Sequence, residues 1–519
     1  MKIFSTNRKT LIFFFSLTVV INLNLAAQTS ISFLISVLKP ETQKVQIELK
    51  LQGFQEDTLV LKLPQWMPGY YQMMNYAENV EHLNCSATDN KEIQIIQPET
   101  NKWQIISNKN KEIIVKYTVN ATRNFVANCY VDSSHAYLVT TGCLLYPENY
   151  INHPVSVKIQ KDERWKNIAT GLEPDPKNSD LLTAADFDML YDCPILIGNL
   201  ESLSDFEVNG IPHHFIGYKI GNFDKILFIT HLQKIVQAAV SIFDDVPYNR
   251  YTFIGIGPGR GGIEHLNNTT ISFNGDNLKT DNDMTPVLSF IGHEYFHNFN
   301  VKRIRPFELG PFDYDRENRT YQLWVSEGLS VYYQNVLMRR AGLTSEDWLL
   351  KTFESQITAL ENNPGRKFQS LAQSSYSTWE DGPFGNREKG KTISYYEKGP
   401  VVGLIFDLAI RHSTKNKKSL DDVMKYVYEL YYKKLQRGFT DAEFRQACEL
   451  IAGVPLTEEF EYVYTSREID YSKYLGFAGI RIEKSTKDDD KTFISLSRIE
   501  NPDALQKAIQ QFWLAENSL

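Results

Sequence analysis

The sequence has 519 residues, a formal net charge of −8 and an ordinary globular composition, with 42% hydrophobic residues. A chain of this length exceeds what one hydrophobic core supports, so two or three domains are predicted. The acidic balance, without a block of basic residues, argues against nucleic acid or an anionic membrane as a partner.

Residues 1–27 are organised like a secretory signal peptide. Basic residues precede an apolar run from Leu11 to Leu25, and Ala26 and Ala27 offer a cleavage site. The apolar run is interrupted by two asparagines, and it is shorter than the roughly 20 residues that a membrane-spanning helix needs. We therefore expect a cleaved signal rather than a membrane anchor. The mature protein is predicted to be periplasmic or secreted, without stable membrane insertion.

Cysteine usage leaves two alternatives open. No two cysteines form a Cys-x-x-Cys pair, which argues against a zinc knuckle. An exported protein can carry one disulfide among the first four cysteines, or all five thiols can be buried and reduced. The cysteines are Cys85, Cys129, Cys143, Cys193 and Cys448.

Residues 28–203 are predicted to form an N-terminal β domain. Short stretches such as Val45–Leu51, Thr58–Leu63 and Glu112–Val119 alternate in polarity or run apolar, and turn residues separate them. Many short strands without a long helix favour a sandwich-like arrangement. The segment Leu63–Tyr70 is a Pro/Gly turn beside an aromatic anchor, to which we assign no chemistry.

The pattern changes after residue 204. Phe223–Phe243 predicts a helix, Tyr251–Ile256 a strand and Thr269–Phe273 an edge strand. The glycine-rich loop between them lacks the Gly-Lys-Ser/Thr ending of a phosphate cradle. Its glycines allow a main chain to come close to a ligand, which makes Gly262 a candidate substrate-binding residue. Further helices are predicted at 286–299, 322–341, 345–362, about 399–412, 419–434 and 440–452.

The predicted helix at 286–299 carries a metal-binding pattern. His293 and His297 are four residues apart, so both imidazoles lie on one face and can reach one cation. Glu294 lies one position round the turn, where it can accept a proton from a metal-activated water. For this helix we expect Thr285 as the N-terminal cap and Pro286 in the first turn.

Two histidines at this spacing also occur by chance in ordinary helices, so a third ligand matters. Glu327 lies in Trp324-Val-Ser-Glu-Gly328, which opens a second predicted helix. Two histidines and a glutamate are a known ligand set for a catalytic zinc. The sequence therefore predicts one zinc ion at His293, His297 and Glu327.

Three runs of sequence carry a family resemblance: Asn300–Pro306, Trp324–Gly328 and Ser394–Gly399. They resemble the bacterial glycyl aminopeptidases, which are zinc peptidases of the gluzincin group, and more distantly aminopeptidase N. The resemblance extends from about residue 30 to about residue 480. It implies an α+β fold in which a thermolysin-like, mainly helical catalytic domain at 204–465 follows the β domain.

The resemblance also implies roles for two further residues. Tyr396 matches the tyrosine that stabilises the oxyanion, just before a helix whose first turn would hold Pro400, and Tyr395 is the competing candidate. Glu264 matches the glutamate that binds the substrate's α-ammonium group, unless it is simply a residue on an exposed strand edge. His265 stands where asparagine is more common, and we assign it no role.

The function expected from these features is a zinc aminopeptidase that removes small N-terminal residues, glycine or alanine, from peptides. The alternatives are a zinc endopeptidase and an inactive peptide-binding relative. Relatives often carry a PDZ domain, whereas residues 466–519 are too few for a complete one and are predicted to form a short C-terminal segment.

Overall fold

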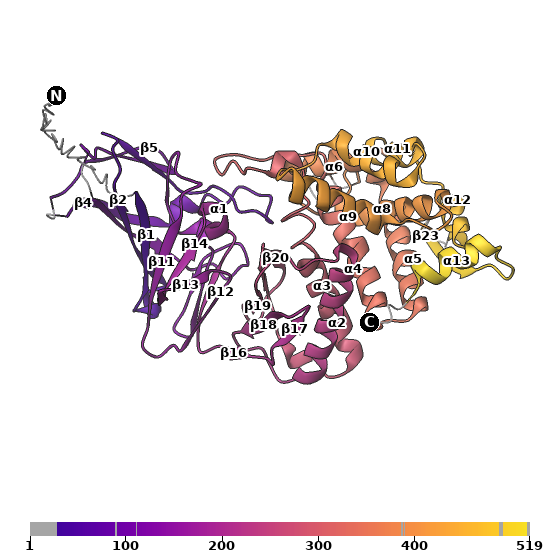
Figure 1. Ribbon diagram of the computed structural model, residues 1–519, viewed down its shortest axis with the longest axis horizontal. Coiled ribbons are helices and arrows are strands. Elements are labelled where there is room, and N and C mark those ends of the chain that lie inside the picture. Colours follow the sequence, from indigo (N-terminus) through magenta and orange to yellow (C-terminus); the bar gives the residue numbers. More distant parts are fainter. Residues whose placement is uncertain are drawn as a thin grey trace, which may run out of the picture.

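The computed structural model describes residues 29–88, 91–109, 112–385, 388, 390–486 and 491–515. The predicted signal peptide lies outside these residues. A β-rich N-terminal region is followed by a mixed sheet and then by a helical region (Figure 1), which confirms the predicted α+β fold.

The N-terminal region is built from three sheets. Alternating side chains of β2 and β7 are buried, as the sequence pattern predicts, and Ile47 pairs with Tyr117 across the two antiparallel strands. The seven-stranded sheet has the order β13 (Glu173–Asp175), β14 (Asn178–Ala184), β11 (Val155–Lys161), β1 (Ser30–Val37), β2 (Lys44–Gln52), β7 (Glu112–Asn120) and β4 (Val80–Ala87). The others are β10 (Tyr146–Pro147), β3 (Leu59–Lys62), β6 (Lys102–Ile105) and β5 (Ile95–Glu99), and β12 (Asn167–Thr170), β15 (Ile195–Gly198), β9 (His135–Leu138) and β8 (Tyr130–Val131); the short helix α1 spans Phe187–Tyr191.

A mixed sheet follows and places Glu264 at its border. Its order is β16 (Glu201–Ser202), β18 (Ile211–Gly217), β19 (Tyr251–Gly255), β21 (Asn268–Ile271) and β20 (Gly262–Glu264), with β17 (Phe206–Val208) also paired to β18. The prediction of an edge strand at 269–273 is wrong, because β21 lies between β19 and β20. The strand at this border is β20, which pairs with β21 on one side only among the described strands.

Two helices lie beside this sheet. The helix α2 (Lys225–Phe243) packs against α3 (Asp281–Phe296), which carries the metal motif. By length and composition α2 could cross a membrane, but 61% of its apolar window is buried inside the fold. Its hydrophobic side chains therefore belong to the core.

The start of α3 differs from the prediction. The helix begins at Asp281 rather than near Pro286, because Thr280 and Asp283 form a capping box one turn earlier. Thr285 is therefore not the cap, and Pro286 lies inside the helix. The helix also ends at Phe296, yet His297 keeps helical backbone angles, so the spacing of the two imidazoles is preserved.

The rest of the chain is mostly helical. Its elements are the π-helical turn η6 (Trp324–Gly328), α4 (Leu329–Arg340), α5 (Glu346–Asn362), α6 (Leu371–Tyr376), α7 (Thr378–Asp381), α8 (Tyr395–Ser413), α9 (Leu420–Val427), the π-helical turn η8 (Tyr428–Lys434), α10 (Asp441–Ala452), α11 (Thr457–Tyr464) and α12 (Tyr471–Phe477). The helix predicted at 399–412 begins earlier, at Tyr395, because Ser394 caps it. Tyr396 therefore lies in the first turn of α8 and Pro400 in its second, not in the positions expected from the sequence.

The C-terminal segment packs on the helical region. A hairpin of β22 (Ile480–Thr486) and β23 (Thr492–Arg498) lies along α5, where Leu496 N donates to a carboxylate oxygen of Glu354 at 3.0 Å. The last helix, α13 (Ala504–Trp513), buries Trp513 in the same core. The domain boundary at 466 remains a prediction.

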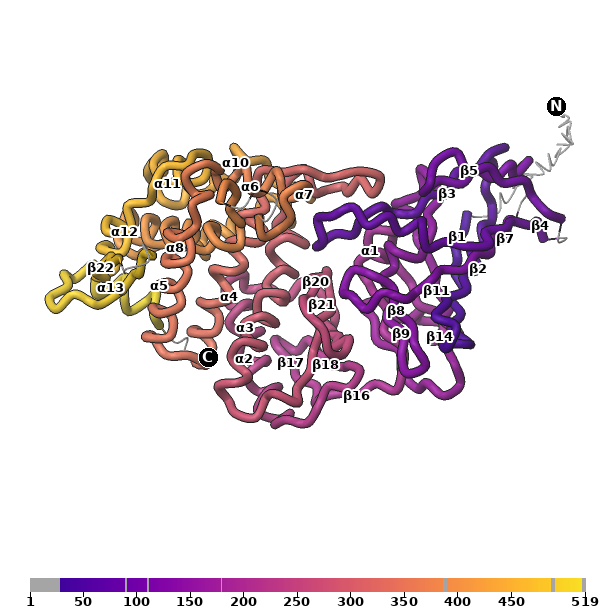
Figure 2. The backbone as a smooth tube through the Cα atoms, turned by 180° about the vertical axis from the view of Figure 1, so that it is seen from behind, coloured from indigo at the N-terminus to yellow at the C-terminus, as the bar shows by residue number. Residues whose placement is uncertain are grey.

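The two regions exchange aromatic anchors. Trp66, from the turn after β3, belongs to the core of the helical region, and its indole N–H donates to the carbonyl of Asp313 at 2.8 Å. Tyr314, from the loop before η6, belongs to the core of the β region and donates to Asp188 at 2.7 Å. Figure 2 shows the violet turn reaching from the β region toward β20. All five cysteines are buried free thiols, which matches the second of the two alternatives.

Candidate active site

The two histidines and Glu327 converge in the core of the molecule. The Nε2 atoms of His293 and His297 are 2.9 Å apart. One oxygen of Glu327 lies 3.2 Å from Nε2 of His297 and 3.7 Å from Nε2 of His293. The ligand atoms of all three lie within 4.8 Å of one another, and all three residues are buried. Among the described residues, this is the group that could hold a metal ion.

Glu327 is directed to the histidines by an unusual turn. Residues Trp324–Gly328 form a π-helical turn ahead of α4, a feature that is often found at functional sites. The side-chain amide of Asn300 donates to the carbonyls of Val325 at 2.8 Å and Ser326 at 3.1 Å. Asn300, just past the metal helix, therefore connects that helix directly to the turn that carries Glu327.

Asn300 also orients His297. The Nδ1 atom of His297 lies 2.7 Å from the carbonyl oxygen of Asn300. A carbonyl can only accept, so Nδ1 carries a proton and Nε2 is the nitrogen directed at Glu327 and His293. A metal bound here would replace the proton on Nε2, and Nε2 would be its ligand atom.

Two glycines allow α8 to approach the turn. A Cβ atom added to Gly399 would lie 2.5 Å from Cα of Gly328, and one added to Gly328 would lie 2.7 Å from Cα of Gly399. The close crossing brings the Tyr396 hydroxyl within 2.9 Å of the Glu327 carboxylate, to which it donates. Burial, reinforced by Glu327, raises the pKa of Tyr396 well above its usual value, so this phenol is a proton donor at neutral pH. Tyr395 instead bonds to Thr378 at 3.1 Å.

The predicted base, Glu294, directly follows His293 on α3. Glu294 is buried, and one of its oxygens has no hydrogen-bond partner among the described residues. Burial raises its pKa well above the ordinary value. Gly262 faces this carboxylate: an added Cβ would lie 2.9 Å from Oε1 of Glu294. Gly262 therefore gives Glu294 its space, a contact that the sequence did not indicate.

Glu264 is buried as well, although its strand borders the sheet. Only 4% of Glu264 is exposed, and Oε1 has no partner among the described residues. This excludes the alternative of an exposed strand-edge glutamate. Burial raises the pKa of Glu264 to about 6. His265 points elsewhere, toward Asp192 at 3.1 Å, and Asp192 also pairs with Lys302 at 2.6 Å.

The carboxylates make the site attractive to cations. Burial opposes charge on His297, but Glu327, Glu264 and Glu294 together raise its pKa to about 10. Burial likewise opposes ionisation of Glu327, yet His297 and His293 hold its pKa far below the usual range. Two imidazoles and a carboxylate in a field that favours positive charge fit a divalent metal of the zinc type.

Sequence reasoning missed the contribution of the N-terminal region. Gly69, at φ +89°, belongs to the Pro/Gly turn that we assigned no chemistry. A Cβ at this position would lie 2.7 Å from Oε2 of Glu264. Tyr71, two residues further along the same turn, is buried as well. The only signal in the sequence was the Pro-Gly pair itself, which predicts a turn but not its distant partner.

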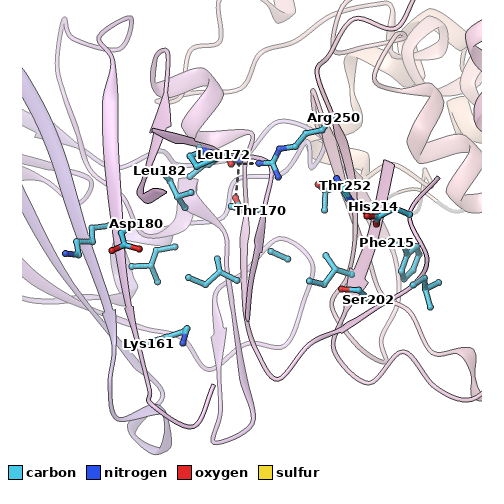
Figure 3. A pocket seen from close by; sticks show the side chains of 18 residues that line it. Lys161, Thr170, Leu172, Asp180, Leu182, Ser202, His214, Phe215, Arg250 and Thr252 are labelled. Atoms are coloured by element: carbon cyan, nitrogen blue, oxygen red, sulfur yellow. Dashed lines mark hydrogen bonds and ion pairs between the residues drawn. The ribbon is translucent and has the colours of Figure 1, made fainter. Parts of the chain in front are cut away.

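A pocket of about 810 Å³ lies elsewhere (Figure 3). It opens between the N-terminal region and the mixed sheet, and its lining includes Leu172, Leu182, His214 and Arg250. It contains none of the predicted site residues. The candidate active site is therefore the buried cluster rather than this pocket.

Family comparisons agree with this geometry. The model of the peptidase M61 N-terminal domain matches residues 32–199, and the model of M61 glycyl aminopeptidase matches residues 286–402. The two ranges together cover more than half of the chain, and the second contains the histidines, Glu327 and Tyr396. The chain belongs to the M61 glycyl aminopeptidase family. It is accordingly a metallo-aminopeptidase, a hydrolase of peptide bonds.

Solved structures with the same fold as this M61 family member include an aminopeptidase N family protein from Idiomarina loihiensis. That protein is 25% identical, with a TM-score of 0.82, over 89% of this chain and 81% of the other. An M1 zinc metallopeptidase from Deinococcus radiodurans is 11% identical, with a TM-score of 0.53, over 85% and 94%. Legionella pneumophila aminopeptidase A is 14% identical, with a TM-score of 0.51, over 91% and 52%. A comparison with curated proteins finds no match.

The glycine crossing can be tested by substitution. Gly399→Ala should push α8 away from η6 and separate Tyr396 from Glu327, because the added methyl group meets backbone rather than a flexible side chain. A displacement of about 1 Å at such a site can lower turnover about 100-fold. The measurement is kcat/KM for aminoacyl anilides. The matched control is Gly476→Ala in α12, where an added Cβ meets no atom within 4 Å. Equal activity of the two variants would contradict the proposed tight crossing.

Proposed function

We propose that the chain is a zinc-dependent aminopeptidase that removes small N-terminal residues, glycine or alanine, from peptides. His293, His297 and Glu327 would hold one zinc ion. The observation that carries the proposal is the buried His-His-Glu cluster, with two further carboxylates, Glu294 and Glu264, beside it. Zinc in such a site acts as a Lewis acid that polarises the scissile carbonyl and lowers the pKa of a water molecule toward about 7.

The chain's own residues supply the proton transfers and the binding contacts. Glu294 takes the proton of the attacking water and delivers it to the leaving amine, and the burial-raised pKa of its carboxyl suits both steps. Tyr396 donates a hydrogen bond to the oxygen that becomes negative during attack, and its raised pKa keeps the phenol protonated for this role. Gly262 allows Glu294 to take up its position.

Glu264 makes the enzyme an exopeptidase in this proposal. A buried carboxylate without a partner is costly unless a cation binds it. The α-ammonium group of a peptide provides that cation and, once bound, sets the first peptide bond at the metal. Zinc and one ammonium group would then carry three positive charges, which equals the three negative charges of Glu264, Glu294 and Glu327. This balance favours an aminopeptidase over an endopeptidase, which binds no α-ammonium group, and the inactive binding protein is distinguished by its lack of turnover.

The proposal includes export to the periplasm or outside the cell. Its support is the organisation of residues 1–27, which lie outside the described part of the structure.

The proposed metal site can be tested by comparing a variant of a metal ligand with a variant of the base. Purified protein should contain one zinc per chain, and chelators should abolish activity. His293→Ala should lose both zinc and turnover, whereas Glu294→Gln should keep zinc and lose turnover by about 10²- to 10⁴-fold, because it removes the base and not a ligand. Metal analysis together with kcat distinguishes the two variants. A fully active protein without zinc would refute the assignment.

The Glu264 assignment predicts selectivity for free amines. Glu264→Gln keeps the shape of the side chain but removes its charge, so kcat/KM for free peptides should fall by roughly 30-fold or more, the scale for one partner of a buried charge pair. N-acetylated peptides lack the ammonium group and should be poor substrates of both proteins. An unchanged ratio of free to blocked substrates would make Glu264 a bystander. Rapid cleavage of internal bonds in blocked peptides would favour the endopeptidase.

The substrate preference is tested with glycyl, alanyl and leucyl anilides. We expect kcat/KM to decrease in that direction, with leucine at least tenfold below glycine, in the range that one side-chain pocket can discriminate. A preference for leucine would identify a broader aminopeptidase with the same catalytic groups. Tight peptide binding without cleavage of any anilide would favour the inactive relative.

A further inference from the structure

The active site is lined in part by a turn that comes from the N-terminal region. Trp66 fixes one end of this turn in the helical region, where its ring packs edge-on against Trp379 at 5.2 Å between centroids. Gln72 fixes the other end, because its side-chain amide donates to the carbonyl of Thr378 at 2.9 Å. The residues between them are therefore held at the site in a defined position. In sequence, this turn precedes Gly262, the first of the other site residues, by about 190 positions.

The turn touches both sides of the site. Gly69 lies against the carboxylate of Glu264, where a Cβ would be 2.7 Å from Oε2. On the far side, Thr378 bonds to the hydroxyl of Tyr395, next to Tyr396. In sequence, Tyr71 lies between the residues that make these two contacts, and its phenol is close enough to Glu327 and Glu264 for their charges to act on it.

Tyr71 is held by packing rather than by polar contacts. It is 6% exposed, and its ring lies 6.4 Å from that of Trp66 and 6.1 Å from that of Trp379. Its hydroxyl forms no hydrogen bond with the described residues. Burial raises the pKa of this phenol well above its usual value, and Glu327 and Glu264 raise it further, which agrees with a neutral ring near both carboxylates.

The chemistry of an N-terminal residue determines what such a ring does. The first α-carbon of a peptide is bonded both to the ammonium group, which Glu264 would bind, and to the carbonyl carbon, which would lie at the metal beside Glu327. An aromatic ring near both anchors therefore lies near this α-carbon and limits the room for its side chain. We infer that Tyr71 is a specificity-determining residue, whose ring closes the pocket for the first side chain and restricts it to glycine and alanine. This inference rests on the proposed aminopeptidase function.

The experiment compares leucyl and glycyl anilides in three variants. Tyr71→Ala should raise the leucyl-to-glycyl ratio of kcat/KM at least tenfold, because an open pocket gains the contacts that the ring excluded. Tyr71→Phe keeps the ring and should leave the ratio within about twofold of wild type. Tyr70→Ala is the matched control, because Tyr70 is in the same turn but packs its ring on Phe125 at 5.3 Å; its ratio should not change.

Two outcomes would overturn the inference: an unchanged ratio in Tyr71→Ala, or a shift in Tyr71→Phe as large as in Tyr71→Ala. Thermal melting shows whether each variant is folded. If Tyr71→Ala does not fold, Tyr71→Leu retains apolar packing on the tryptophans while removing the ring, and the same criteria apply. A wild-type enzyme that cleaves no anilide would instead refute the proposed function, so the two failures are distinguishable.

Discussion

Negative charge buried around two imidazoles is the constraint on which the site depends. Glu264, Glu294 and Glu327 are each at most 4% exposed. Carboxylates in such surroundings cost several kcal/mol each unless cations or hydrogen bonds compensate them. The two histidines and the Tyr396 hydroxyl compensate Glu327, whereas one oxygen of Glu264 and one of Glu294 have no partner among the described residues. The buried carboxylates therefore favour the binding of cations, and a metal ion together with a substrate ammonium group can provide the positive charge.

Two of the sequence runs that resemble the family, Trp324–Gly328 and Ser394–Gly399, acquire a physical meaning from this arrangement. The last residue of each run, Gly328 and Gly399, lies where η6 and α8 cross. A side chain at either one would separate the glutamate of the first motif from the tyrosine of the second. Asn300 connects the same turn to the end of the metal helix through two backbone carbonyls. Three short stretches of sequence therefore determine a single geometry.

Local patterns predicted the parts of the site that depend on local structure. The i, i+4 histidines predicted one helical face, and alternating polarity predicted the strands of the β region. The predicted start of α3 was wrong, because Pro286 indicated the first turn whereas the Thr280–Asp283 capping box begins the helix earlier. The prediction of an edge strand at 269–273 was wrong because the true edge strand, β20, is too short to show a hydrophobic pattern in the sequence. Local patterns could not predict that Tyr71 belongs to the site, because the contacts that bring its turn to Glu264 join residues almost 200 positions apart.

The exchange of Trp66 and Tyr314 has a consequence for how such proteins can change over time. Each aromatic residue completes the core of the region to which it does not belong by sequence. A gene rearrangement that joined this β region to another catalytic region would remove an anchor from both cores at once. We therefore expect the two regions to be inherited together, because separating them would leave each core without one of its aromatic side chains.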